Sequence, residues 1–434
     1  ATTSAQTADR HAVNQPDAAA WAKGSRFIRA CLRQPVDRTP VWFLRQAGRY
    51  MPEYRAVRAN HSLLEICRTP SLAAEVTITA AEFLGVDAAI IFADLLLPLT
   101  PMGLAFEFVA DEGPRVHSPI RTLDQVRTLR TDRTEELSYV ARALELVAKH
   151  FAQKGFLKGT ASAVPFDLNK TGGALAPEGM PLNQDALGII GFCGAPFTLA
   201  SYMIEGGSSR NYIETKKLMY ASAPITQDCH PERSETAERD REVEGPAVRL
   251  NDHSRSNVSH PESQTWPLLM EKLVTVLADF AAQQVEAGAD VIQVFDSWAG
   301  ALSPSDYRDY VLAPTTDLIR RIQALGVPVI YFGVDTATLL PLMRKTGADV
   351  LGLDWRTPLD QAWRSLDYSV AVQGNLDPIT LFAPETVLHA RVEEILAAAN
   401  GRPGHIFNLG HGIVPHTPVD AVLSVVQQIK NSMR

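Results

Sequence analysis

The fold is decided by one run of the chain, residues 369–410, which reads SVAVQGNLDPITLFAPETVLHARVEEILAAANGRPGHIFNLG. Its two ends, SVAVQG from Ser369 and HIFNLG from His405, are short apolar segments that predict β-strands. Between them apolar residues recur at the spacing of one helix face: Leu388, Val392, Ile395 and Ala399. A strand–helix–strand unit of this kind joins parallel strands in a sheet that helices cover on both faces.

Further apolar segments of the same kind precede this unit: VWFLRQ from Val41, VDAAIIF from Val86, GIIGF from Gly188, DVIQVF from Asp290, PVIYF from Pro328 and DVLGLD from Asp349. A second amphipathic helix is marked by Leu269, Leu273, Val276, Leu277 and Phe280. Eight such strands predict an α/β fold, a single (β/α)8 TIM-type barrel, rather than an open doubly wound sheet. No GxGxxG follows the first strand, which argues against a dinucleotide-binding sheet. LAFEFV and GPRVHSPI predict a hairpin after the second strand.

We expect residues 1–23 to form a flexible tail and residues 24–434 to form the barrel. Two stretches do not fit the pattern of strands that alternate with helices. Residues 154–186 hold five glycines and three prolines, and residues 224–265 are strongly charged, with 13 charged residues among the 34 from Cys229 to Glu262. Such compositions bury little apolar surface, and long loops are uncommon inside compact domains. Both stretches are therefore predicted to be surface insertions.

The composition excludes several classes of protein. Hydrophobic residues make up 46% of the chain, enough for a large core. With 41 basic and 49 acidic side chains the net charge is −8, so we expect no general attraction for nucleic acid or an anionic membrane. Four separated cysteines favour a reducing, cytoplasmic compartment. Leu187 to Ile204 carries no charge, but its glycines and Pro196 indicate a strand, a turn and a helix start rather than a membrane span.

A zinc site is an alternative for the second insertion, which contains Cys229, His230, His253 and His260. Their spacing matches no compact ligand pattern, and no periodic element holds them together. We therefore favour a mobile insertion without a metal.

In a barrel of this type the active site lies at the carboxyl ends of the strands. Polar residues follow nearly every predicted strand: Arg45, Gln46, Arg49, Asp94, Asp296, Ser297, Asp335, Asp354, Asn375, Asp377 and His411, with Gly48 between Gln46 and Arg49. Phe192 and Gly194 follow the third strand, and Trp355 follows Asp354. Helix capping explains any one of the Asp, Ser and Asn residues, but their convergence on one rim favours a functional site.

The segment LRQAGRYMPEYRAVR, residues 44–58, sets four arginines against the single acidic residue Glu53. Arginine grips carboxylates with a planar fork of donors, so this segment predicts an anion site. Gly48, between Arg45 and Arg49, lets the backbone approach a ligand closely. The alternative is a solvated, charged helix start.

Asp94 lies in IIFADLLLPL with apolar residues on both sides. Such surroundings either raise the pKa of a carboxyl group or require a cationic or N–H donating partner. A capping aspartate is the alternative.

A series of motifs resembles, in order, those of the uroporphyrinogen decarboxylase family: RQAGRYMPEYR, FADLLLPLTPMG, GFCGAPFTLASYMIEGG, FDSWAG, GLDWR, QGNLDP and NLGHGI. The resemblance spans roughly residues 24–430 apart from the two insertions, which the family generally lacks. It implies a single-domain (β/α)8 barrel, a homodimer, in the cytosol and without metal or organic cofactor. The implied reaction removes CO₂ from the four acetate side chains of uroporphyrinogen III, giving coproporphyrinogen III for haem and chlorophyll.

The resemblance also implies roles for single residues. Arg45 and Arg49 correspond to the arginines that bind substrate carboxylates, and Asp94 to the aspartate that accepts hydrogen bonds from the pyrrole N–H groups and stabilises positive charge. The pocket between the arginines would be lined by Gln46, Ala47 and Gly48. Further polar contacts would come from Tyr202, Ser297 and His411, and apolar walls from Phe192 and Phe295.

The chemistry of the reaction agrees with these residue types. Direct loss of CO₂ from a pyrrole acetate leaves an unstabilised carbanion, whereas prior protonation makes the pyrrole an electron sink. A fixed carboxylate such as Asp94 complements the resulting buried cation. The proton donor is left open between Arg45, acting through a bound carboxylic acid or water, and His411.

Three rival functions are weighed against this one. Corrinoid-dependent methyltransferases share the fold but need a zinc site of His and Cys, and Cys193 has no HxC partner nearby. A tetrapyrrole carrier would need the arginines but not Asp94. A Schiff-base aldolase needs a lysine at a strand end, and none of the predicted strand ends supplies one.

Overall fold

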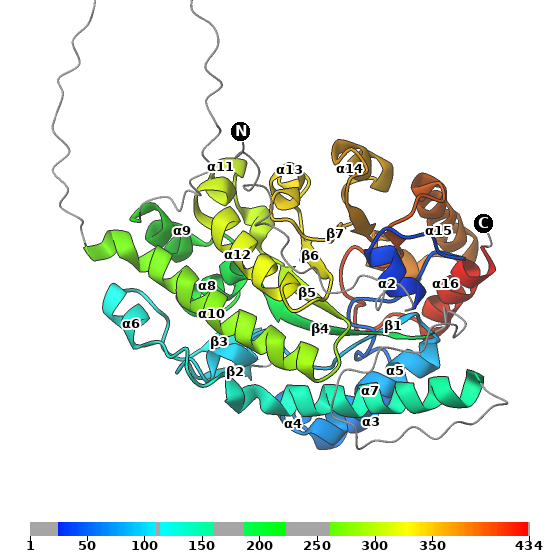
Figure 1. Cartoon of the computed structure of the whole chain (residues 1–434), viewed down its shortest axis with the longest axis horizontal. Coiled ribbons are helices and arrows are strands. Elements are labelled where there is room, and N and C mark those ends of the chain that lie inside the picture. Colours follow the sequence, from blue (N-terminus) through cyan, green and yellow to red (C-terminus); the bar gives the residue numbers. More distant parts are fainter. Residues whose placement is uncertain (1–24, 110–112, 160–185, 223–260, 433–434) are drawn as a thin grey trace, which may run out of the picture.

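The computed structural model describes residues 25–109, 113–159, 186–222 and 261–432 (Figure 1). Within them, a parallel sheet has the strand order β1-β4-β5-β6-β7-β8-β9. Its strands are β1 (Ala88–Ile90), β4 (Gly188–Gly194), β5 (Val291–Asp296), β6 (Val329–Gly333), β7 (Val350–Gly352), β8 (Ala371–Gln373) and β9 (His405–Ile406). Every neighbouring pair is parallel, which confirms the predicted parallel α/β sheet.

Successive residues of these strands enter two different buried clusters, as the two-residue repeat of a strand requires. Val291 lies in one cluster and Ile292 in the other, and Val350 and Leu351 divide in the same way. The sheet is therefore buried on both faces, and for this reason its strands are continuous apolar runs in the sequence.

Helices pack around the curled sheet (Figure 1). The two predicted amphipathic helices are α10 (Thr265–Glu286), which buries Leu269 and Leu273, and α15 (Glu385–Ala399), which buries Leu388. The other α-helices of the described residues are α2 (Arg26–Cys31), α3 (Pro52–Asn60), α4 (Leu63–Arg68), α5 (Pro70–Leu84), α6 (Leu123–Thr128), α7 (Ser138–Gly159), α8 (Pro196–Glu205), α9 (Ile213–Tyr220), α11 (Pro304–Asp306), α12 (Leu312–Gln323), α13 (Leu340–Arg344), α14 (Leu359–Ser365) and α16 (Val419–Asn431). Short helical turns are η1 (Leu97–Leu99), η2 (Thr134–Leu137), η3 (Pro261–Gln264), η4 (Ala299–Ala301), η5 (Tyr307–Val311) and η6 (Pro378–Phe382).

Two local predictions are confirmed. The uncharged stretch from Leu187 to Ile204 divides into β4 and α8, with Pro196 in the first turn of the helix. The hairpin consists of β2 (Phe106–Val109) and β3 (Gly113–Val116), which pair antiparallel. In the part of the chain that the structure describes, none of the helices has the length and apolarity to cross a membrane.

The prediction of a full strand from Val41 is wrong. The structure has only an isolated parallel bridge there, between Val41 and Phe407. The backbone turns soon afterwards: the N–H of Gln46 donates to the carbonyl of Phe43 (3.0 Å), and Arg45 has a φ of 60°. This turn limits the extended segment to a few residues.

Residues 40–42 nevertheless have backbone partners on both sides. The N–H of Phe407, beside β9, donates to the carbonyl of Pro40 (2.8 Å). The N–H of Asp87, which precedes β1, donates to the carbonyl of Val41 (2.8 Å). The segment therefore lies between the two outer strands of the sheet.

The structure describes a few residues at the ends of the two predicted insertions. Residues 154–159 and 261–265 are helical, so each insertion is shorter than the sequence predicted. Helix α7 continues through Gly159. The glycine within it, Gly155, costs a helix only about 1 kcal/mol, and no proline interrupts the helix before Gly159. Residues 261–265 form η3 and the first residue of α10, beside the buried Trp266, whose backbone N–H donates to Ser222 Oγ (3.2 Å). The remainder of both insertions and the tail 1–23 lie outside the described residues.

A buried ion cluster fixes the segment before β1. Asp87 accepts hydrogen bonds from Arg26 Nη1 (2.9 Å), from both terminal nitrogens of Arg38 (2.7 and 2.8 Å) and from the backbone N–H of Val41 (2.9 Å). Arg26 also binds Asp37 through two hydrogen bonds (2.8 and 2.9 Å). Two cations and two carboxylates thus balance each other where α2 meets the sheet.

We predict that Asp87→Asn lowers the free energy of unfolding by about 3–5 kcal/mol, because it leaves buried guanidinium groups without their counter-charge. Urea titration measures this loss. Asp317→Asn is the control, since its carboxylate binds Arg320 and Arg321 near the surface of α12 and is expected to contribute less than about 1 kcal/mol. Equal losses in the two variants would contradict the role given to Asp87.

Candidate active site

The turn after Leu44 presents the first predicted site arginine. The N–H of Ile413 donates to the carbonyl of Leu44 (2.9 Å), which ties the turn to the loop after β9. Gly412 makes room for the Arg45 side chain, because a β-carbon on Gly412 would lie 2.4 Å from Arg45 Cδ. Arg45 therefore lies against the loop that carries His411.

Gln46 and Gly48 shape this turn. Gln46 is buried, its Nε2 donates to the carbonyl of Ala88 (3.2 Å), and its own carbonyl accepts from the hydroxyl of Tyr50 (2.7 Å). A β-carbon on Gly48 would lie 3.0 Å from the carbonyl oxygen of Arg45. The side chain of Gln46 is therefore engaged in holding the turn.

The four arginines of residues 44–58 divide into two pairs. Arg55 donates to the carbonyl of Arg49 (3.0 Å), and Arg58 donates to the carbonyl of His61. Arg45 and Arg49 are exposed, and among the described residues neither is in an ion pair with a carboxylate. These two guanidinium groups are thus available to an anionic ligand.

Asp94 follows β1, and its side chain is half-buried. Its Oδ1 accepts from the N–H of Leu96 (2.9 Å). Burial raises the pKa of the Asp94 carboxyl, while the Leu96 N–H and the charge of Arg45 oppose the rise. Both alternatives considered for Asp94 are present together, since burial raises its pKa and it has an N–H donor and a nearby cation, Arg45.

Two pairs of aromatic side chains lie among the predicted site residues, and one of them includes a neighbour of Asp94, Tyr202. The rings of Phe192 and Phe295 meet edge to face with centroids 5.6 Å apart. Tyr202 packs on Trp298 with centroids 3.8 Å apart. Burial and the nearby charge of Asp94 raise the pKa of Tyr202, so its hydroxyl stays protonated at neutral pH. Sequence reasoning missed Trp298, although it stands directly after the predicted contact Ser297.

The side chain of Asp296 is fully buried, and its hydrogen-bond partners are core residues. Its two oxygens accept from Thr198 Oγ1 and from the hydroxyl of Tyr331, both at 2.7 Å. Burial raises the pKa of Asp296 to about 6. Thr198 Oγ1 also accepts from the N–H of Trp298 (3.3 Å), so the buried carboxylate fixes the backbone on which the half-buried Ser297 lies.

His411 is neutral at physiological pH. Burial and the charges of Arg45 and Arg356 lower its pKa to about 4. Its Nδ1 accepts from the N–H of Gly412 (2.7 Å), so the ring proton is on Nε2, which can donate to a ligand. A neutral donor beside arginine suits a carboxylate ligand.

The remaining strand-end residues serve the loops themselves. Asp354 accepts from the N–H of Asp335 and from Arg356, and Asn375 donates to the carbonyls of Asp354 (2.7 Å) and Thr357 (2.7 Å). Asp377 caps η6 through the N–H of Ile379 (2.9 Å). The capping interpretation is thus correct for Asp377.

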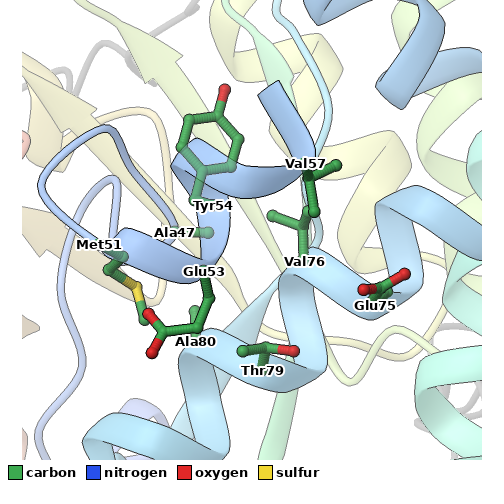
Figure 2. A pocket seen from close by; sticks show the side chains of 9 residues that line it. All are labelled: Ala47, Met51, Glu53, Tyr54, Val57, Glu75, Val76, Thr79 and Ala80. Atoms are coloured by element: carbon green, nitrogen blue, oxygen red, sulfur yellow. The ribbon is translucent and has the colours of Figure 1, made fainter. Parts of the chain in front are cut away.

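A small cavity lies beside this site, between α3 and α5 (Figure 2). It is lined by Ala47, Met51, Glu53, Tyr54, Val57, Glu75, Val76, Thr79 and Ala80. Its two carboxylates, Glu53 and Glu75, make it unfavourable for an anionic ligand, and it shares only Ala47 with the predicted site residues.

The described residues contain no group of three His, Cys, Asp or Glu side chains that could hold a metal ion. Cys193 is buried, and burial raises the pKa of its thiol to about 12. The alternative zinc ligands Cys229, His230, His253 and His260 lie outside the described residues.

We predict that the His411 imidazole titrates with a midpoint near pH 4, measured by NMR and assigned by the signal that His411→Gln removes. The unfolded chain takes up this proton near pH 6.5, so the free energy of unfolding falls as the pH decreases from about 6.5 to about 4. His411→Gln is expected to lose less stability over that range. A midpoint near 6.5 would contradict the packing described for His411.

Known proteins resemble this chain over most of its length. The family described as Uroporphyrinogen decarboxylase (URO-D) matches residues 22–169, 182–229 and 256–432. A uroporphyrinogen decarboxylase of Koribacter versatilis is 54% identical over 402 residues, which cover 92% of this chain and 94% of the relative. That of Chloroflexus aurantiacus is 47% identical over 411 residues, covering 94% and 95%.

A solved methyltransferase from Methanosarcina mazei matches the structure with a TM-score of 0.65 and 18% identity, over 93% of this chain and 97% of its own. At that identity the likeness shows the fold alone. The family match and the relatives, by contrast, extend over most of the sequence, and this chain belongs to the uroporphyrinogen decarboxylase family.

Proposed function

We propose that this protein is a carboxy-lyase of tetrapyrrole biosynthesis that removes CO₂ from the four acetate side chains of uroporphyrinogen III, giving coproporphyrinogen III. The observation that carries the proposal is the half-buried Asp94 carboxylate beside the exposed guanidinium group of Arg45, with Arg49 on the same turn. The relatives from Koribacter versatilis and Chloroflexus aurantiacus bear the name of this activity.

Asp94 and the arginines divide the chemistry between them. Protonation of a pyrrole ring makes it an electron sink for the bond that breaks when CO₂ leaves. Asp94 accepts hydrogen bonds from the pyrrole N–H groups and stabilises the cationic ring, and its half-buried setting strengthens that interaction. Arg45 and Arg49 bind the carboxylates of the substrate through paired hydrogen bonds.

The proton reaches the ring on the side of Arg45, through a bound carboxylic acid or a water molecule. Arg45 is favoured over His411 for this step, because in the ligand-free protein a pKa of about 4 leaves almost no imidazolium at neutral pH. Its Nε2–H instead donates a hydrogen bond to the substrate.

The other proposed contacts complete the pocket. Gln46, Ala47 and Gly48 form the turn between the two arginines, where Gln46 acts by holding the backbone in place. Tyr202 and Ser297 supply hydroxyl groups. The ring pair of Phe192 and Phe295 supplies an apolar wall.

We further propose that residues 40–44 act as the first strand of a closed (β/α)8 barrel, supported by their backbone hydrogen bonds to Phe407 and Asp87. The two insertions lie on its surface.

The protein is proposed to be a cytoplasmic homodimer that needs no cofactor or metal and binds no nucleic acid. Mass measurement in solution tests the dimer, and activity after treatment with a chelator tests the independence from metal.

The proposed function is tested by incubating the protein anaerobically with uroporphyrinogen III. Chromatography is expected to show products with seven, six, five and finally four carboxylates. Absence of these products would overturn the assignment.

Asp94→Asn keeps the shape of the side chain but removes the charge that offsets the cationic ring. We predict that kcat falls by ~10²–10³, the usual effect of losing one preorganised electrostatic group. Asp360→Asn on α14 is the control and is expected to leave turnover unchanged. If Asp94→Asn kept more than about half of the wild-type turnover, Asp94 would not be catalytic.

Arg49→Lys keeps a positive charge but loses the planar fork of donors. We predict a rise in KM for uroporphyrinogen III of about tenfold, because one charge-assisted hydrogen bond is lost. Arg321→Lys, on the surface of α12, serves as the matched control. An unchanged KM in Arg49→Lys would show that Arg49 does not bind the substrate.

A further inference from the structure

The motif GLDWR ends in an arginine that none of the roles above uses. Arg356 follows β7, and the central carbon of its guanidinium lies 4.1 Å from the centre of the Trp355 ring. Its Nη1 donates to Asp354 Oδ2 (2.9 Å), and its backbone N–H donates to Asp354 Oδ1 (3.0 Å). The side chain of Arg356 is nevertheless 43% exposed. Trp355 and Asp354 thus hold a guanidinium group whose outer edge faces solvent.

The loop that carries Arg356 is in close contact with the His411 loop. A β-carbon on Gly410 would lie 2.3 Å from the backbone nitrogen of Trp355, so glycine allows the two backbones to meet. The rings of Trp355 and His411 meet edge to face with centroids 6.4 Å apart. The charge of Arg356 acts on His411 together with that of Arg45. His411 therefore has an arginine from the β7 loop and an arginine from the turn after Leu44 as neighbours.

The donors of Arg356 are only partly used. A guanidinium group has five N–H donors, and the bond to Asp354 is made by Nη1. Asp354 also receives the backbone N–H groups of Asp335 and Arg356, so its negative charge is shared. Arg402 shows the contrast: it too lies over an aromatic ring, that of Tyr368 (4.4 Å), but its Nη1 donates to carbonyls at the end of α15.

We propose that Arg356 is a further substrate-binding residue, which grips one carboxylate of the tetrapyrrole together with the Nε2–H of His411. The proposal rests on the proposed function and adds a contact from the β7 loop to those of Arg45 and Arg49. Asp354 and Trp355 fix the guanidinium before the substrate arrives, so little side-chain freedom is lost on binding. Because the contact is made to the bound substrate as well as to the transition state, it acts on KM rather than on kcat.

The kinetic test compares Arg356→Gln and Arg356→Lys with the control Arg364→Gln, an exposed arginine of α14 that pairs with Asp360. With uroporphyrinogen III, Arg356→Gln is expected to raise KM by about tenfold or more with kcat changed less than about twofold. Arg356→Lys is expected to restore part of the loss, and the control to behave as wild type. The KM of Arg356→Gln is also expected to depend less on salt than that of wild type.

A second measurement does not depend on turnover. In the ligand-free protein, Arg356→Gln removes a cation beside His411, so the NMR titration midpoint of His411 is expected to move upward, whereas Arg364→Gln leaves it unchanged. An unshifted midpoint would show that Arg356 is not a neighbour of His411.

The outcomes separate the two proposals. Wild-type protein that forms no decarboxylated product overturns the proposed function. Normal wild-type turnover with an unchanged KM in Arg356→Gln overturns the role of Arg356, and a lowered melting temperature alone in that variant assigns Arg356 to the support of its loop.

Discussion

The rest of the structure depends on the hydrogen bonds and ion pairs that the carboxylate of Asp87 makes. The carboxylate accepts hydrogen bonds from the buried Arg26, from the partly buried Arg38 and from the N–H of Val41, while the backbone N–H of Asp87 donates to the carbonyl of Val41. The segment thus held leads directly into the turn at Arg45. The cluster lies at the amino end of β1, whereas Asp94 follows the carboxyl end. The ion cluster and the candidate site therefore lie at opposite ends of the same strand, an arrangement that is usual in barrels of parallel strands.

The order and direction of the strands could be predicted because strands buried on both faces are continuous apolar runs. The directions of the side chains at the strand ends could not be predicted. Successive residues of a strand point to opposite faces, so an error of one residue in the register reverses every direction. Phe295 and Ser297 flank Asp296, yet the carboxylate of Asp296 bonds to Thr198 and Tyr331 in the core. The burial of Gln46 was also beyond the sequence, because it depends on a hydrogen bond to Ala88, which is distant in the chain.

The charged and titratable groups of the candidate site differ in how far they are buried. The permanent cations Arg45 and Arg49 are exposed, where a guanidinium group keeps its hydration until a ligand replaces the water. The titratable groups are more enclosed: burial favours the neutral form of His411 and opposes the ionised form of Asp94. The two arginines are thus more exposed to solvent than the carboxylate of Asp94, which is half-buried. This difference suits a ligand that is anionic at its edge and becomes cationic at its centre.

The hydrogen bond between the backbone of Trp266 and Ser222 Oγ has a practical consequence for protein engineering. It brings the end of α9 and the start of α10 together, so the chain that joins them begins and ends at nearly the same point. For a flexible linker placed between these two ends, the entropy of closure grows only with the logarithm of the linker length, by about 0.6 kcal/mol for each doubling. A fluorescent reporter domain with neighbouring termini could therefore replace the connection and leave the helices on either side in their places.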